Sequence, residues 1–341
     1  MAISLFKPTI RRRDMNNALT CMVGDNIGPG KYSQELVSCF THLLGLIGGT
    51  ALMSYYSCLL LALDILELEP GDKVIISPLS PGIYIDVLEA RGVTPLFIDV
   101  DPDSGVIMPS ELEQEKYKQA KAVILHYTLG FVPNFDEISQ YGIPIIEDIS
   151  QALGSTWGDK PCGGLGDITV LSLDPHNIIT CGSGGLVLVN KKQHAACLKR
   201  ILEVSPEYAR LADLNAAVGL AQFKQLGQFL ETRREIAEIF SKALMRSKHS
   251  TLVQKEGGQN NNFSFPVMVS QSMMEIRKFA GKYTIETHSA FNETVITRHD
   301  EVYEAFTNAK KLLLRCVLFP LYPALGKKSV EEIAKVLAVL P

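Results

Sequence analysis

Six short apolar runs recur along the first two thirds of the chain, and they constrain the fold more than any other feature. Several are apolar at every position, which is typical of strands covered on both faces. Helical patterns and turn signals such as PGD and RGVTP separate the runs. We therefore expect an α/β fold with a mostly parallel mixed sheet flanked by helices. The runs are VIIS from Val74, LFIDV from Leu96, AVILHY from Ala122, IPIIED from Ile143, ITVLSL from Ile168 and GLVLVN from Gly185.

The pattern changes after Asn190, where apolar residues recur at three- and four-residue spacing over 213–244. This spacing predicts one long amphipathic helix. A chain of 341 residues exceeds what one small core usually organises. We therefore expect a large α/β domain over 1–225, including an N-terminal segment, and a smaller C-terminal α/β domain over 226–341, entered through the long helix. The polar stretch 254–262 predicts a flexible loop, followed by short strands and helices.

Composition excludes several classes of function. A net charge of −4 gives no general attraction for nucleic acid or for an anionic membrane, and we interpret the basic run Arg11–Arg13 as a solvated segment. The seven cysteines are scattered without CxxC spacing, which argues against a disulfide framework and a zinc site, so no metal is expected. We find no signal peptide and no apolar stretch long enough to span a bilayer. These features predict a soluble cytoplasmic protein.

Longer motifs indicate a family. The segments NIGPGKYSQELVSCF, LALDILELEPGDKVIISP, IPIIEDISQALGSTWGDKPCGGLGDITVLSL and RLADLNAAVGLAQFKQL occur in an order and spacing that resemble the DegT/DnrJ type of pyridoxal phosphate (PLP) dependent nucleotide-sugar aminotransferases. The resemblance covers nearly the whole chain. It implies a PLP-transferase fold of type I and a homodimer with coenzyme sites at the subunit interface. It also implies a role in nucleotide-sugar and polysaccharide metabolism.

Three pocket residues of that family are retained. The resemblance places Asp148 against the pyridinium nitrogen of the coenzyme, Gln151 beside its phenolic oxygen, and Ser172 on its phosphate. Each has a simpler interpretation as well, because an acid or a serine at the end of a strand can cap a following turn. For Asp148 we favour inherited pocket geometry.

Other pocket positions depart from the family. In SLDPHNIITCGSGG, residues 172–185, the position of the Schiff-base lysine holds Asn177, and an amide nitrogen is not basic enough to form that bond. The Gly-Thr pair that offers backbone N–H groups to the phosphate aligns with Tyr55 and Tyr56, whose phenols would fill that space. The ring-stacking aromatic aligns with Pro81, and the partner subunit's phosphate asparagine aligns with Tyr208. The GSGG turn keeps its glycines without the family's glutamate.

Our preferred interpretation is a degenerate sugar aminotransferase homologue, because the losses concentrate where the coenzyme would lie. We expect no covalently bound coenzyme, and only weakened binding of PLP or pyridoxamine phosphate (PMP). The predicted role is a binding or regulatory homodimer, with a nucleotide-sugar ligand or an active family relative as its partner.

Two alternatives remain open. Some family members use histidine at the lysine position for a sugar dehydration, so His176 could serve an active aminotransferase or dehydratase although it lies one residue early. An amine from Lys160, Lys191 or Lys192 could also replace the lysine. The second alternative is a coenzyme-free enzyme. It would use Tyr55, Tyr56, Asp148 and His176 in the emptied cleft.

Overall fold

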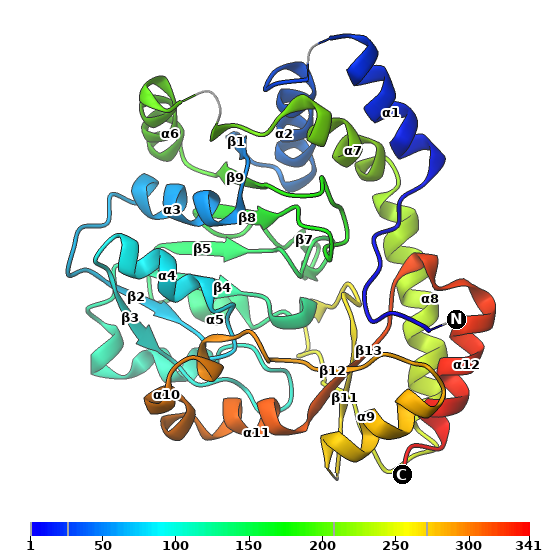
Figure 1. Ribbon diagram of the computed structural model, residues 1–341. Helices are drawn as coiled ribbons and strands as arrows, with labels where there is room; N and C mark the ends of the chain where they lie inside the picture. The colour runs from blue at the N-terminus through cyan, green and yellow to red at the C-terminus, as the bar shows by residue number, and fades with distance from the viewer. Residues whose placement is uncertain (1, 26, 207–208, 271) are drawn as a thin grey trace.

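The computed structural model describes residues 2–25, 27–206, 209–270 and 272–341. Its main feature is a seven-stranded sheet in the order β1-β9-β8-β5-β4-β2-β3 (Figure 1). Strand β9 runs antiparallel to both of its neighbours, and the other neighbouring strands run parallel. All six predicted runs form strands of this sheet. They are β2 (Lys73–Ile76), β3 (Thr94–Phe97), β4 (Ala122–His126), β5 (Ile145–Asp148), β8 (Ile168–Ser172) and β9 (Gly185–Val189).

One edge strand, β1 (Gly48–Leu52), was not predicted from the sequence. Its sequence GGTAL contains two glycines, which weaken the strand pattern. Gly49 is required by packing, because a Cβ there would lie 2.6 Å from the carbonyl oxygen of Val187 on the neighbouring strand. Gly49 therefore allows β1 to approach β9 closely. The same glycine weakens the apolar pattern from which the strand would be predicted.

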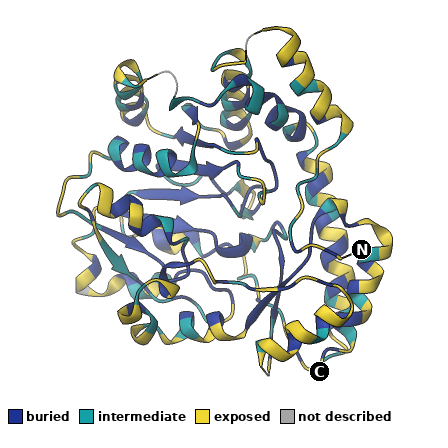
Figure 2. Cartoon of the chain, viewed as in Figure 1, coloured by how far each residue is buried: buried dark blue, intermediate teal, exposed yellow. Residues whose placement is uncertain are grey.

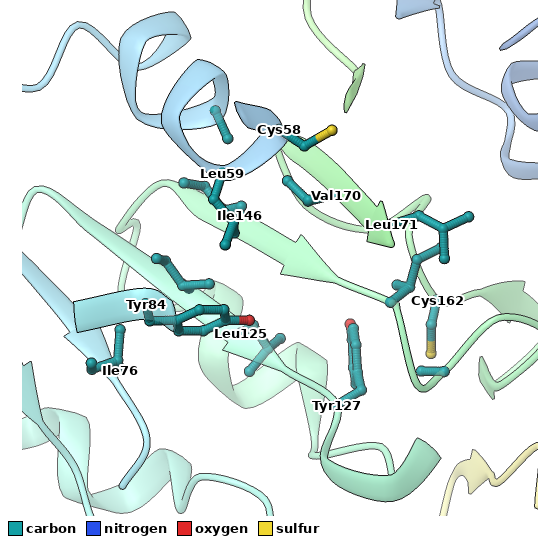
Figure 3. Close-up of a cluster of buried hydrophobic side chains, with 14 of the residues drawn as sticks. Cys58, Leu59, Ile76, Tyr84, Leu125, Tyr127, Ile146, Cys162, Val170 and Leu171 are labelled. Carbon is teal, nitrogen blue, oxygen red and sulfur yellow. The ribbon is translucent and has the colours of Figure 1, made fainter. Parts of the chain in front are cut away.

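Helices cover the large sheet. Helix α3 packs against β8 and β9, and α2 packs against β1 and β9. Figure 3 shows part of the buried core between the first helices and the strands, with Tyr84 coming from α4 and Tyr127 from the end of β4. The helices of this part are α1 (Arg12–Val23), α2 (Lys31–Leu44), α3 (Tyr55–Ile65), α4 (Ile83–Ala90), α5 (Phe135–Ser139), α6 (Lys192–Val204) and α7 (Asp213–Phe223).

A second, smaller sheet in the order β11-β13-β12 lies in the C-terminal part of the chain. It has its own cluster of buried apolar side chains, separate from that of the large sheet. The domain boundary at residues 225 and 226 stays a prediction. The elements are α8 (Leu226–Leu244), β11 (Phe265–Met268), α9 (Met273–Lys282), β12 (His288–Ser289), α10 (Asp300–Ala305), α11 (Thr307–Arg315), β13 (Cys316–Phe319) and α12 (Gly326–Ala338).

The long helix predicted over 213–244 is wrong as a single element, because the structure divides it into α7 and α8. Gln225 lies between them with φ −112° and ψ 2°, outside helical geometry. Its side-chain nitrogen donates to Asp14 at 3.2 Å, and its side-chain oxygen accepts from Arg11 at 3.0 Å. Contacts with the N-terminal segment therefore bend the chain where the apolar spacing continues unbroken.

The polar stretch 254–262 is also more ordered than a loop without fixed partners. Residues Gly258–Gln259 form strand β10, which pairs with β6 (Thr156–Trp157), and β6 pairs with β7 (Lys160–Pro161). Asn261 is buried and donates to the carbonyls of Gln151 and Leu153 at 2.9 and 3.0 Å. Its amide supplies hydrogen bonds that a loop close to the sheet edge needs.

Two global features complete the description. Along the described residues, no helix combines the length and apolarity needed to cross a membrane. In the same part of the chain, no three His, Cys, Asp or Glu side chains group closely enough to hold a metal ion. Figure 2 shows the strands of the large sheet as buried and much of α1 as exposed.

Arg233 joins α8 to two other chain segments. Its side chain is 5% exposed, and its Nη1 donates to the carbonyls of Asn262, Phe263 and Leu321 at 3.2, 2.8 and 2.9 Å. Burial lowers its pKa to about 10. The guanidinium thus satisfies three backbone acceptors that would otherwise lie without donors.

We predict that Arg233→Met lowers the free energy of unfolding by about 3 kcal/mol, because the three carbonyls lose a charged donor. Urea denaturation measures this change. The neighbouring Arg234 pairs with Glu231 at the surface, where solvent screens the pair, so Arg234→Met should leave the free energy of unfolding close to that of the parent. Equal losses in the two variants would contradict the assigned role.

Candidate functional site

The candidate site lies at the carboxyl ends of the central parallel strands. His126 ends β4, Asp148 ends β5 and Ser172 ends β8, and the sheet register pairs His126 directly with Asp148. Tyr55 opens helix α3, which begins just after β1. In open α/β sheets, ligands bind in the crevice outside these strand ends. The topology therefore collects the predicted pocket residues at one edge of the sheet.

Asp148 is the centre of the site. Its carboxylate is fully buried, and its Oδ2 accepts the hydroxyls of Tyr55 and Tyr84 at 2.5 Å each. The Nδ1 atom of His126 lies 3.4 Å from the same oxygen. Oδ1 accepts the backbone N–H and the hydroxyl of Ser150 at 3.0 and 2.6 Å. Groups of this chain thus surround both carboxylate oxygens.

These contacts keep Asp148 ionised. Burial alone would raise the pKa of the carboxyl, but hydrogen bonding and the charge of His126, together with the hydroxyls of Ser150 and Tyr55, outweigh it and lower the pKa to about 2. The same burial, reinforced by the Asp148 charge, raises the pKa of Tyr55 and Tyr84 well above the ordinary value. The two phenols are therefore neutral hydrogen-bond donors to an anion.

A second anion lies at the end of β8. The hydroxyl of Ser172 donates to Oδ2 of Asp174 at 2.7 Å, and the backbone N–H of Asp174 lies 3.2 Å from that hydroxyl. Ser172 is the residue that the family resemblance assigns to a phosphate. A carboxylate in direct contact with this hydroxyl opposes a phosphate there through like-charge repulsion.

The side chains of Asn177 and His176 make different contacts. The side-chain nitrogen of Asn177 donates to the carbonyl of Ser172 at 2.9 Å, so the amide folds back on its own strand end. His176 is exposed and stacks on Phe6, with ring centroids 5.2 Å apart. Both residues line the same cavity, but nothing connects His176 to Asp148.

Each of the remaining predicted residues makes its own set of contacts. Gln151 accepts the backbone N–H of Leu129 at 2.6 Å through its side-chain oxygen, and Pro81 pairs with Thr294 in a bridge between chain segments. Tyr56 packs against the core and is not part of the cavity wall, unlike Tyr55. Tyr208 lies outside the described residues.

A cavity of about 560 Å³ opens beside these groups. Its walls come from both sheets and from the N-terminal segment. Among the described residues that line it there is no lysine and no arginine. Lys160 is exposed on β7, Lys192 is exposed at the start of α6, and Lys191 pairs with Asp167 at the surface. The lining includes Phe6, Tyr55, Pro81, His126, Thr128, Gln151, Ser172, Asp174, His176, Asn177, Glu286, His288 and Glu293.

Three observations bear on whether this site would hold PLP. The carboxylate that would face a ring nitrogen already accepts two phenols, and the hydroxyl that would face a phosphate already donates to a carboxylate. No primary amine lines the cavity within the described residues. The glycine turn after β8 does keep the expected geometry, with positive φ at Gly182 and Gly184.

Sequence analysis missed Tyr84, Ser150 and Asp174. Tyr84 lies 64 positions before Asp148, and only the packing of α4 shows that its hydroxyl reaches the carboxylate. The sequence did contain a sign of Asp174, because this acid stands two residues after Ser172, which the family resemblance assigns to the phosphate. His126, which ends β4, also contacts Asp148.

Comparisons with known proteins identify the family of this chain. The family model for DegT/DnrJ/EryC1/StrS aminotransferases matches residues 8–338. The chain belongs to this family. It is 27% identical to a GDP-perosamine synthase of Escherichia coli over 98% of this chain and 97% of that protein. A GDP-perosamine synthase of Caulobacter vibrioides is 26% identical over 72% and 70%.

Solved structures agree on the fold. A sugar aminotransferase of Streptococcus pneumoniae in its PLP form has a TM-score of 0.91 at 20% identity, covering 99% of this chain and 98% of that one. A GDP-4-keto-6-deoxy-D-mannose-3-dehydratase of Escherichia coli, with bound hydrated PLP, has a TM-score of 0.88 at 19% identity, covering 99% and 100%. The expected type I fold of PLP enzymes is thereby confirmed.

We predict that Asp148 makes stability depend on acid pH. Its folded pKa of about 2 lies below the ordinary 3.8, so its contribution is complete above about pH 5 and is lost as the pH falls toward 2. The full effect is about 2 kcal/mol, of which about 1 kcal/mol is lost between pH 5 and pH 3. Urea unfolding of Asp148→Asn should show a pH slope flatter by that amount. The exposed Asp103→Asn should keep the parent slope, and identical slopes for the parent and Asp148→Asn would refute the assignment.

Proposed function

We propose that this chain does not transaminate and acts instead as a homodimeric binding homologue of the sugar aminotransferases, with a nucleotide-linked sugar as its ligand. The contact that supports this proposal most is the 2.5 Å hydrogen bond from Tyr55 to Asp148. A phenol of the chain engages the carboxylate that the family reserves for its coenzyme. Asn177 adds a second argument, because it cannot provide the amine that the family's chemistry needs.

The cavity offers polar groups to the sugar part of such a ligand. Hydroxyl, amide and imidazole groups line much of it, and such groups can exchange hydrogen bonds with a sugar. Its volume of about 560 Å³ lies within the usual range for small-molecule sites, about 300–1,000 Å³. The relatives named GDP-perosamine synthases suggest a GDP-linked sugar as the first ligand to test.

The alternative of an active enzyme has weaker support. His176 is separated from Asp148 and stacks on Phe6, and Lys160, Lys191 and Lys192 do not line the cavity. For a coenzyme-free enzyme, Tyr55, Tyr56, Asp148 and His176 would need to converge. Only Tyr55 and Asp148 are in contact, and both are held in a pair whose phenol pKa is raised. A neutral phenol bound to an ionised carboxylate is a poor base.

We predict opposite results for two ligands in isothermal titration calorimetry. A GDP-linked sugar should bind saturably, whereas PLP should give no saturable heat, because ring and phosphate contacts are already taken. In a parallel spectrophotometric titration, the protein should not shift the absorbance band of PLP. Asn292 is exposed at the cavity wall, so Asn292→Trp should weaken sugar binding at least about tenfold by narrowing the opening.

Lys192→Trp on α6 is the matched control, and it should bind the sugar as the parent does. Borohydride treatment followed by peptide mapping locates any coenzyme adduct. A stoichiometric adduct on a side chain of the cavity would overturn the proposal. Failure of the sugar to bind would remove the ligand assignment and leave the loss of transamination standing.

The proposed homodimer has a candidate surface on α1. Met15, Leu19, Met22 and Val23 are 53, 57, 53 and 83% exposed, and their spacing places them on one face of the helix. Such a contiguous apolar stripe at the surface of a single chain is typical of an interface. Figure 2 shows α1 at the outer edge of the molecule.

We predict that Leu19→Glu combined with Met22→Glu converts the dimer into a monomer, because two carboxylates would be buried in an apolar contact. Light scattering coupled to gel filtration measures the mass. Met274 and Leu314 are also exposed but lie on other helices, so Met274→Glu with Leu314→Glu should leave the mass unchanged. Loss of the dimer in the control pair alone would place the interface elsewhere.

A further inference from the structure

A second cavity lies in the C-terminal part of the chain, apart from the strand-end site. It is a groove of about 1070 Å³ between α8 and α12, closed at one side by the end of α9 and by Ile3. Figure 1 shows α8 and α12 side by side at the lower right. The groove shares no lining residue with the cavity beside Asp148. We call it the basic groove.

Its rim is strongly cationic in a chain whose net charge is −4. Five basic side chains line it, against one carboxylate, Glu332. All five are exposed, and none forms an ion pair with a described residue. Cations held together without counter-charges create a local positive potential that attracts an anionic partner. They are Lys242, Arg246, Lys282, Lys328 and Lys335.

The floor of the basic groove is apolar. Ile239, Tyr283 and Val339 line it while remaining 44, 50 and 61% exposed. Large apolar side chains exposed together beside charges are typical of an interaction surface. A partner that covered only the cations would leave this apolar area in water.

The shape of the basic groove, its charge and its apolar floor together favour one class of binding partner. Lys328 and Lys335 are seven residues apart on α12, which separates them by about 10 Å along the helix axis. Acidic residues two turns apart on a bound helix would meet this spacing, and leucines between them would face the floor. A free phosphate would leave the floor uncovered, and a flat membrane surface would not enter a groove between two helices.

We propose that the basic groove binds an acidic amphipathic helix of a partner protein. Opposite charges on the two sides steer the association, and burial of Ile239 and Val339 against the apolar face of the partner helix holds it. This interaction is independent of the ligand in the strand-end cavity. Because its chemistry differs from that of a nucleotide-linked sugar, the two can be tested separately.

The test uses a fluorescein-labelled synthetic helix of about 18 residues, with leucines on one face and glutamates two turns apart on its flanks. Fluorescence anisotropy should show saturable binding to the full chain, weakened by added salt because screening shortens the range of the rim charges. Lys242→Gln, Arg246→Gln and Lys335→Gln together should weaken binding at least about tenfold. Val339→Ser should weaken it less and leave its salt dependence unchanged.

Two controls fix the interpretation. Lys121→Gln, Lys192→Gln and Lys199→Gln together remove the same number of exposed charges elsewhere and should bind as the parent does. A peptide of the same composition in scrambled order should bind at least about tenfold more weakly. Thermal unfolding verifies that each variant is folded.

Three outcomes would overturn the proposal. The first is no saturable binding of the amphipathic peptide to the parent chain. The second is equal affinity for the scrambled peptide or for the groove variant. The third is that vesicles containing phosphatidylglycerol, or inorganic pyrophosphate, bind through the groove cations while the peptide does not.

Discussion

The site is organised around one buried negative charge. A carboxylate without solvent is costly unless hydrogen-bond donors and a positive neighbour surround it. Here α3 supplies Tyr55, α4 supplies Tyr84 and β4 supplies His126, while Ser150 donates from the turn after β5. The charge therefore connects the first helices to the centre of the sheet. A change at this carboxylate is thus expected to affect the fold as well as the cleft.

The cleft contains two anions whose hydrogen-bond donors come from within the chain. Asp148 has its phenols and Asp174 has the hydroxyl of Ser172. The chain thus satisfies internally the two places where the family resemblance expects ring and phosphate. What remains is a cavity without lysine or arginine among its described lining residues, whose hydroxyl, amide and imidazole groups are suited to hydrogen bonding.

Sequence analysis predicted the sheet well because continuous apolar runs have few other ways to be buried. It failed where tertiary contacts determine the local secondary structure. The glycines of β1 hide a strand, and the bonds of Gln225 to Asp14 and Arg11 break a helix whose apolar spacing continues. At the site, residue types were foreseeable but side-chain directions were not. Tyr55 was expected at a phosphate and instead reaches a carboxylate 93 positions away, where Tyr84 joins it.

The hydrogen bond of Tyr55 also bears on how such a protein can change over generations. Restoring a lysine at position 177 by itself would return an amine to a cleft in which Asp148 still accepts two phenols. Removing Tyr55 first would deprive Asp148 of a donor and cost stability before any catalytic gain could compensate. A substitution in the first turn of α3 is thus expected to act on the buried charge at the centre of the sheet before it acts on anything bound in the cleft.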